Sequence, residues 1–112
     1  MSGKKYIKGF LEDIVLHLIG ENGEMYGYEI TQKVRDLSKG VIAITEGALY
    51  PVLHKLEREE KLMVSYRKID GRLRKYYRLT PEGGKRAESA SQELTDFLNG
   101  LAGLFNLNTG NA

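Results

Sequence analysis

The chain contains 112 residues, of which 41% are apolar and 29% are charged, and its formal net charge is +2. This length predicts one small domain, and this composition is typical of a soluble, folded protein rather than a disordered one. The sequence contains no cysteine, which excludes disulfide bonds, thiol catalysis and cysteine-ligated metal sites. Because no apolar run approaches the ~20 residues of a membrane span and the N-terminus lacks the pattern of a signal peptide, we expect a cytoplasmic location.

The first segment of the chain predicts two helices and a short strand. From Ile7 to Leu18, apolar residues recur at spacings of three and four, which is the pattern of an amphipathic helix. Apolar residues on its other faces predict that this helix contacts a partner as well as its own core. A second periodic segment covers residues 28–38 and should end at Gly40. The β-branched run at residues 41–44 predicts one short strand.

A third helix is predicted from Thr45, although it contains a proline. Thr45 is a suitable N-cap, and the leucines and valine that follow it are spaced to form one buried face. Pro51 removes a backbone donor and would crowd the carbonyl group of Gly47. We therefore expect either a local kink or a helix that starts later than Thr45.

The face of this helix opposite the leucines carries polar side chains, namely Glu46, Tyr50, His54, Lys55, Arg58 and Lys61. Such side chains can bind phosphates and base edges in the major groove of DNA. An ordinary solvated helix face is the alternative, and Glu57, Glu59 and Glu60 support it because carboxylates repel phosphate. Taken alone, this helix favours the solvated face.

A β-hairpin is predicted after Lys61, where the apolar period changes from 3.6 to 2 and Asp70-Gly71 marks the turn. The segment 62–79 contains six basic residues and one acidic residue, a net charge of +5: the basic ones are Arg67, Lys68, Arg72, Arg74, Lys75 and Arg78. This concentration of positive charge favours contact with a phosphate backbone. The alternative is a solvated hairpin whose charges only discourage the addition of further strands.

The last predicted helix begins with Thr80 as its N-cap and Pro81 at its first position. Its apolar residues alternate spacings of three and four, which is a heptad seam: Ala87, Ala90, Leu94, Phe97, Leu101 and Leu104. We interpret this seam, together with the first helix, as a two-fold interface between subunits. The alternative is that the seam folds back onto its own domain.

The order of these elements predicts an α+β fold that is mainly α, a winged helix-turn-helix with a β-hairpin wing and an added C-terminal helix. Residues 1–80 would form the winged-helix domain, whose first helix also contributes to dimerisation. Residues 81–105 would form the C-terminal dimerisation helix, and residues 106–112 a disordered tail.

The sequence gives no indication of a catalytic site. His17 lies within an apolar helix, where a lone histidine is more often a structural residue than a base. His54 has no serine, cysteine or aspartate at a spacing that suggests a relay. The adjacent Glu59 and Glu60 would point in different directions on a helix, and the glycine-rich segments lack the context of a phosphate-binding loop. We therefore expect no enzymatic activity, no cofactor and no metal site.

Three segments together resemble the PadR-type transcriptional regulators: "YGYEI" at 26–30, "GALYPVLHKLE" at 47–57 and "GRLRKYYRLTPEG" at 71–83. The resemblance implies a winged helix that represses nearby promoters as a homodimer on a palindromic operator. It also implies that the helix bearing Pro51 enters the major groove while the wing follows the adjacent minor groove or the backbone.

The chain departs from the family pattern at three points. Met25 and Tyr26 stand where the family often has proline and histidine, and Glu60 stands where a glycine usually ends the recognition helix. Multidrug-sensing members stack flat aromatic ligands between tryptophans, which this chain lacks. Phe97 or Phe105 would have to take that role here.

The resulting hypothesis is a sequence-specific regulator of transcription that binds double-stranded DNA and itself, with an unidentified small-molecule effector and no membrane partner. The residues expected to bind DNA are Thr45, Tyr50, Pro51, His54, Lys55, Arg58, Lys68, Arg72, Arg74 and Lys75. Those expected at the dimer interface are Phe10, Ile14, Ala90, Leu94, Phe97, Leu101 and Leu104. The alternatives are a winged helix that binds only proteins and a small enzyme.

Overall fold

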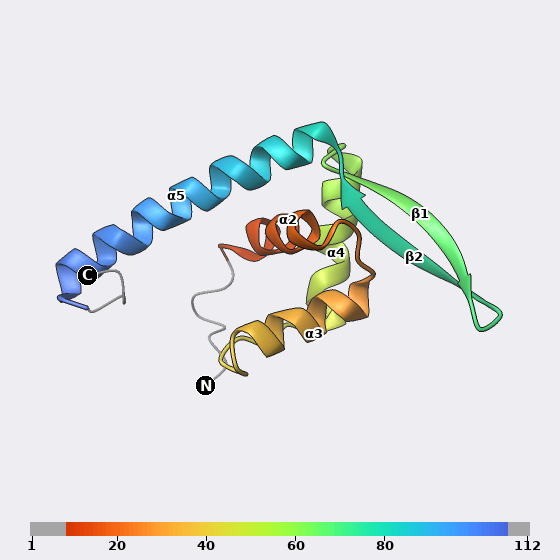
Figure 1. The fold of residues 1–112 in the computed structure, drawn as a ribbon, viewed down its shortest axis with the longest axis horizontal. Coiled ribbons are helices and arrows are strands. Elements are labelled where there is room, and N and C mark those ends of the chain that lie inside the picture. Colours follow the sequence, from red (N-terminus) through yellow and green to blue (C-terminus); the bar gives the residue numbers. More distant parts are fainter. Residues whose placement is uncertain (1–8, 108–112) are drawn as a thin grey trace.

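The computed structural model describes residues 9–107. The elements follow in the order α2 (Leu11–Asn22), α3 (Gly27–Leu37), α4 (Glu46–Arg58), β1 (Leu62–Ile69), β2 (Arg72–Leu79) and α5 (Pro81–Phe105). Helices α2, α3 and α4 form a body from which the β-hairpin and helix α5 extend in opposite directions (Figure 1). This arrangement confirms the expected winged helix with an added C-terminal helix. The expected start of the first helix at Ile7 and the tail at 108–112 lie outside the described residues.

The hydrophobic core lies between the three helices of the body and the base of the hairpin. Its buried side chains are Val15, Leu16, Leu18, Ile19, Met25, Ile30, Val34, Leu49, Leu53, Leu56, Leu62 and Tyr77. The backbones of Met25 and Tyr77 exchange two hydrogen bonds, of 3.0 and 2.8 Å, which attach the α2–α3 connection to the edge of β2. The hairpin, called the wing below, is therefore fixed to the body at its base.

The wing forms as the sequence predicts. Strands β1 and β2 are antiparallel, with Leu62 opposite Leu79 at the base and Ile69 opposite Arg72 at the tip. Asp70 and Gly71 form the turn, and both have positive φ angles, of 51° and 80°. A two-residue turn of this kind matches the right-handed twist of the strands.

The strand expected at 41–44 is wrong, because these residues form an irregular segment. The hydroxyl group of Ser38 accepts a hydrogen bond from the backbone N–H of Ile42, at 3.0 Å, and donates to its carbonyl oxygen at 3.1 Å. A local side chain thus satisfies the backbone groups that a neighbouring strand would have bound. Ile42 and Ile44 instead pack, half-buried, against the core.

Helix α4 begins at Glu46, directly after Thr45, so the alternative of a later start is wrong. The Thr45 hydroxyl oxygen accepts a hydrogen bond of 3.1 Å from the N–H of Ala48, as an N-cap does. Pro51 lies inside the helix. A Cβ atom on Gly47 would meet only the Thr45 hydroxyl oxygen, at 3.8 Å, so the proline ring does not depend on a glycine at this position. The local kink remains a prediction.

The wing and helix α5 start from one joint, formed by Glu60, Lys61, Thr80 and Gly83. Glu60 has a left-handed φ of 60°, and the N–H of Lys61 bonds back to the Leu56 carbonyl at 2.9 Å, which ends α4 in a Schellman turn. The Lys61 carbonyl accepts the N–H of Thr80 at 3.1 Å, and the Thr80 hydroxyl donates to the Glu60 carbonyl at 2.6 Å.

The molecule is elongated because two elements leave the body. Its radius of gyration is 15.3 Å, against about 13 Å for a compact domain of similar size. Asn106 caps α5 in a left-handed conformation, and the Leu107 N–H bonds to the Ala102 carbonyl at 2.9 Å, while the disordered tail stays a prediction. Within residues 9–107, none of the helices has both the length and the apolar character that crossing a membrane requires.

Candidate nucleic-acid interface

The solvent-facing side of helix α4 carries Pro51, His54 and Arg58, with Thr45 at the N-terminal end, and all four residues are exposed. This is the helix that the sequence predicts to enter the major groove. The opposite side buries Leu49, which belongs to the core, together with the next leucines along the helix. The core therefore determines which side chains α4 presents to solvent.

Tyr50 does not belong to this exposed face, contrary to expectation. Its ring is half-buried and packs against the core, because α3 crosses α4 at this point. A Cβ atom on Gly27 would lie only 2.6 Å from the Tyr50 hydroxyl oxygen, so a glycine there permits the close crossing. Burial, and then the carboxylate of Glu46, raise the pKa of Tyr50. Its hydroxyl group therefore stays protonated at neutral pH.

Lys55 is exposed but already has acidic partners. Its ammonium group forms an ion pair with Glu12 of α2 and a second one with Glu59, at 3.7 Å. The hydrogen bond with Glu12 is the first cause of the raised pKa of Lys55. A phosphate would have to compete with these carboxylates for Lys55, whose expected contact with DNA stays a prediction.

The basic residues of the wing fall into two groups. Two of them form ion pairs with acids of the body: Arg67 with Glu24, and Lys75 with Glu57 at 3.3 Å. Burial disfavours the charge of Lys75, but Glu57 and Tyr77 together favour it, so the pKa of Lys75 is raised.

The other group includes the residues near the turn. Lys68 and Arg72 are exposed, and within residues 9–107 neither forms an ion pair or lies over an aromatic ring. Arg74 is half-buried and lies 4.2 Å from the ring centre of Tyr26. Arg78, near the base of the wing, is also exposed and forms no ion pair within residues 9–107, so the basic residues free to meet a polyanion lie both near the turn and at the base.

A depression of about 300 Å³ joins α4 to the wing. Its lining comes from the start of α3, from α4 and from β2: Tyr26, Gly27, Tyr28, Tyr50, His54, Leu73, Arg74, Lys75 and Tyr77. Four residues expected to bind DNA thus meet at one place, namely Tyr50, His54, Arg74 and Lys75. Tyr26, Tyr28 and Leu73 were not expected there. The aromatic motif at 26–30 carried a signal for the first two, whereas Leu73 is an isolated apolar residue in a charged segment.

The residues expected at a dimer interface divide between packed and exposed positions. Ile14, Ala90 and Leu94 line an apolar groove of about 230 Å³ between α2 and α5 of the same chain. The rings of Phe10 and Phe97 lie 6.4 Å apart. Ala90 is only 3% exposed, so α2 already covers a residue that we expected to contact a second subunit.

The other residues of the seam lie toward the end of α5. Phe97 is 52% exposed and Leu104 is 82% exposed, while Leu101 is half-buried. Phe105, which we considered as a stacking residue for a ligand, is 67% exposed. The second half of the seam therefore remains uncovered within one chain.

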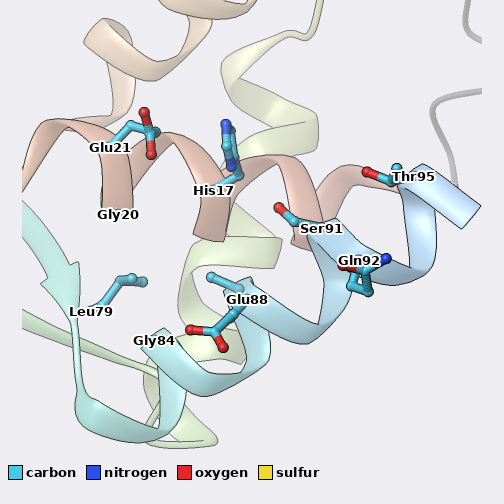
Figure 2. Close-up of a pocket in the computed structure, with 10 residues that line it drawn as sticks. His17, Gly20, Glu21, Leu79, Gly84, Glu88, Ser91, Gln92 and Thr95 are labelled. Carbon is cyan, nitrogen blue, oxygen red and sulfur yellow. The ribbon is translucent and has the colours of Figure 1, made fainter. Parts of the chain in front are cut away.

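A second depression, of about 460 Å³, lies between α2 and the first half of α5 (Figure 2). His17 and Glu21 line it from α2, and Glu88 and Ser91 line it from α5. Among the hydrogen bonds and ion pairs of residues 9–107, none joins His17 to a carboxylate. The arrangement therefore lacks the oriented base that a hydroxyl nucleophile requires.

The comparisons with known proteins agree with this geometry. Residues 15–90 match the family described as the transcriptional regulator PadR-like family. The transcriptional regulator Rv3488 of Mycobacterium tuberculosis is 41% identical over 69 residues, which are 62% of this chain and 61% of that protein.

Solved structures of regulators share the fold. A transcriptional regulator from Clostridium thermocellum is 30% identical with a TM-score of 0.78, covering 88% of this chain and 92% of that one. A PadR-like transcriptional regulator from Bacillus cereus is 26% identical with a TM-score of 0.80, covering 94% of this chain and all of that one. The family consists of transcriptional regulators, which confirms the expectation that the chain is not an enzyme. The chain belongs to the PadR-like family of transcriptional regulators.

Proposed function

We propose that this regulator is a cytoplasmic repressor that binds a palindromic operator as a homodimer. Helix α4 enters the major groove through Pro51, His54 and Arg58, while the wing places Lys68 and Arg72 against the adjacent minor groove or the backbone. Two copies related by a two-fold axis then read two half-sites about 34 Å apart, or a multiple of that spacing.

The observation that carries this proposal is the depression shared by α4 and the wing. Tyr50 and His54 reach it from α4, and Arg74 and Lys75 reach it from β2, so the two elements present one continuous surface. On this surface the side chains near α4 can read base edges, while the basic residues at the wing tip bind phosphate. A winged helix that binds only proteins would not require base-reading and phosphate-binding side chains on one surface.

The exposed apolar residues of α5 support the homodimer. Phe97, Leu98, Leu104 and Phe105 are each more than half exposed, on a helix that extends beyond the body. A second copy of the chain would cover them by heptad packing.

An effector would then bind near this interface, where the apolar groove between α2 and α5 lies. It changes DNA binding only if its affinity differs between the DNA-bound and the free arrangement of the two copies.

The proposal is tested by selecting bound sites from a random DNA duplex library. We expect a palindromic site bound at least ~10³-fold more tightly than random duplex. The logarithm of the association constant should then fall linearly with the logarithm of the salt concentration, by about 0.9 for each phosphate contacted. A flat response to salt with no preferred site would instead identify a protein-binding module.

Repression is tested separately from binding. The selected site is placed across a promoter, and transcripts are measured in a purified transcription reaction with and without the protein. A repressor lowers the transcript level, whereas a protein that recruits polymerase raises it. The palindrome with one half-site scrambled is the control, and a dimer should bind it far more weakly than the intact site.

A further inference from the structure

The direction of the wing depends on contacts at its base. The wing is a single two-stranded ribbon that extends away from the body (Figure 1). A two-stranded hairpin is barely stable by itself, so its orientation must come from the residues that hold it. The core holds one face of the ribbon through Leu62, Val64 and Tyr77. The other face is held by a different set of side chains.

Three side chains of that second face form a continuous stack with Tyr26, which comes from the connection between α2 and α3. The guanidinium group of Arg67 lies 4.2 Å from the ring centre of Tyr76. The ring of Tyr76 meets that of Tyr26 edge-on, with their centres 5.4 Å apart and their planes at 72°. The guanidinium group of Arg74 lies 4.2 Å from the ring centre of Tyr26. We call these four residues the arginine–tyrosine stack.

Strand register explains why these residues meet. Arg67 pairs with Arg74 across the two strands, and Ser65 pairs with Tyr76, so alternation places Arg67, Arg74 and Tyr76 on one face. Met25 is bound to Tyr77 at the edge of β2, which places its neighbour Tyr26 beside Tyr76. The stack therefore ties the wing to the connection between α2 and α3.

The stack also resolves a conflict of charge. Like charges that face each other across two strands repel, as Arg67 and Arg74 do here. Each of these arginines instead lies over an aromatic ring, and Arg67 also forms an ion pair with Glu24. The two guanidinium groups are thereby held in fixed directions.

One member of the stack also faces the proposed DNA surface. Arg74 lines the depression that joins α4 to the wing, together with Tyr26. A displaced Tyr26 ring would free the Arg74 side chain and loosen the wing relative to α4.

We propose that Tyr26 is a positioning residue for DNA binding, which acts through Arg74 and Tyr76 to hold the wing in register with helix α4. This inference rests on the proposed function, since it concerns how α4 and the wing bind one duplex together. Tyr26 supplies the face of its ring rather than its hydroxyl group. Arg74 is the group through which the effect reaches the duplex.

The first experiment uses the selected duplex and four variants: Tyr26→Leu, Tyr26→Phe, Arg74→Ala and the double variant Tyr26→Leu/Arg74→Ala. Tyr26→Leu should weaken binding about five- to tenfold, the effect of losing one cation–aromatic contact, and lower the salt slope by about 0.9. Tyr26→Phe keeps the ring and should bind like the wild type. In the Arg74→Ala background, Tyr26→Leu should add little.

Two outcomes would overturn the inference. If Tyr26→Phe binds as weakly as Tyr26→Leu, the hydroxyl group acts directly. If the effects of Tyr26→Leu and Arg74→Ala add fully in the double variant, Tyr26 does not act through Arg74. The wild-type protein is titrated first, because its failure to prefer any site would reject the proposed function and not the stack.

A second measurement needs neither DNA nor a destabilising variant. In the free wild-type protein, the side-chain protons of Arg74 should show the upfield NMR shift that the ring of Tyr26 imposes, and Tyr26→Phe should retain it. Random-coil shifts for Arg74 would show that the stack does not persist in solution. This result would overturn the inference even if Tyr26→Leu failed to fold.

Discussion

The wing carries charged side chains beyond the body, whereas the end of helix α5 carries apolar ones. Both elements start from the same joint and extend in opposite directions (Figure 1). Near the tip of the wing, Lys68 and Arg72 are exposed. Toward the end of α5 the exposed residues are Leu104 at 82% and Phe105 at 67%. Both elements extend from the body, but the wing exposes basic side chains and the end of α5 exposes apolar ones.

This difference indicates two kinds of partner. Exposed basic residues remain hydrated until a polyanion binds, and they then release its counterions. Exposed apolar residues on a long helix gain by leaving water, and a second copy of the same helix offers a matching surface. The body between them is closed within one chain, because its core residues are almost completely buried. The two extensions therefore carry a basic and an apolar surface, while α4 in the body exposes Pro51, His54 and Arg58.

The largest effect is expected at the apolar end. Leu104→Asp should raise the dissociation constant of the dimer at least ~100-fold, because two-fold symmetry removes a buried leucine twice, at roughly 1.5–3 kcal/mol each. Leu104 is 82% exposed in the single chain, so the fold itself should not change. Sedimentation measures the dimer, and Asn99→Asp adds the same charge elsewhere on α5 as a control. A variant that remains dimeric would place the interface elsewhere.

Replacing Gly83 by alanine should disrupt the joint from which the wing and α5 start. A Cβ atom on Gly83 would lie 2.0 Å from the Lys61 carbonyl oxygen. We expect Gly83→Ala to lower the free energy of unfolding by about 3 kcal/mol, as strongly overpacked sites do. Urea denaturation at fixed protein concentration measures this change.

The neighbouring glycine provides the control for the joint. A Cβ atom on Gly84 would meet nothing within 4 Å. Gly84→Ala should therefore stabilise the helix by roughly 0.5–1 kcal/mol, through the better helix propensity of alanine. Equal effects of the two substitutions would show that the contact between Gly83 and Lys61 is not tight in solution.

At the charged end, we expect Arg72→Ala to weaken DNA binding about tenfold for all sequences and to lower the salt slope by about 0.9, because one phosphate contact is lost. Lys55→Ala should leave the slope unchanged, because Glu12 and Glu59 already hold that ammonium group. Titration of the selected duplex at several salt concentrations separates the two. An unchanged slope in Arg72→Ala would remove this residue from the phosphate contacts.

A small effect is expected at the turn where the wing begins. Glu60 has a φ of 60°, a left-handed conformation that is unfavourable for a residue with a side chain. Glu60→Gly should stabilise the fold by about 1 kcal/mol, after allowance for the greater freedom of glycine in the unfolded chain. Glu59→Gly should destabilise it, because Glu59 has an ordinary φ of −85°. Urea denaturation of the two variants decides the sign.

Residues that interact with near neighbours could be predicted well. Thr45 and Thr80 cap the helices that follow them, and Asp70-Gly71 turns the hairpin, as the sequence indicates. The predicted strand at 41–44 failed for a local reason too, since the Ser38 hydroxyl group binds the backbone of Ile42. Side-chain capping of this kind is hard to recognise in a β-branched segment, where strand propensity is the stronger signal.

Residues whose role depends on distant partners could not be predicted. The helical pattern placed Tyr50 on the outward face, but α3 covers it. The wing contains six basic residues, and the sequence could not show that Glu24 and Glu57 form ion pairs with two of them. Periodicity describes one element at a time, and it does not tell which other element covers a given face.

The sequence by itself determined the elements and the family of this regulator, because turn residues, caps and periodic apolar positions act over a few residues. Tertiary structure alone decided which basic residues are free, which aromatic residues are covered, and how the α2–α3 connection holds the wing through Tyr26. The physical reason is distance along the chain. Tyr26 and Arg74 lie far apart in sequence, and only the pairing of Met25 with Tyr77 brings them together.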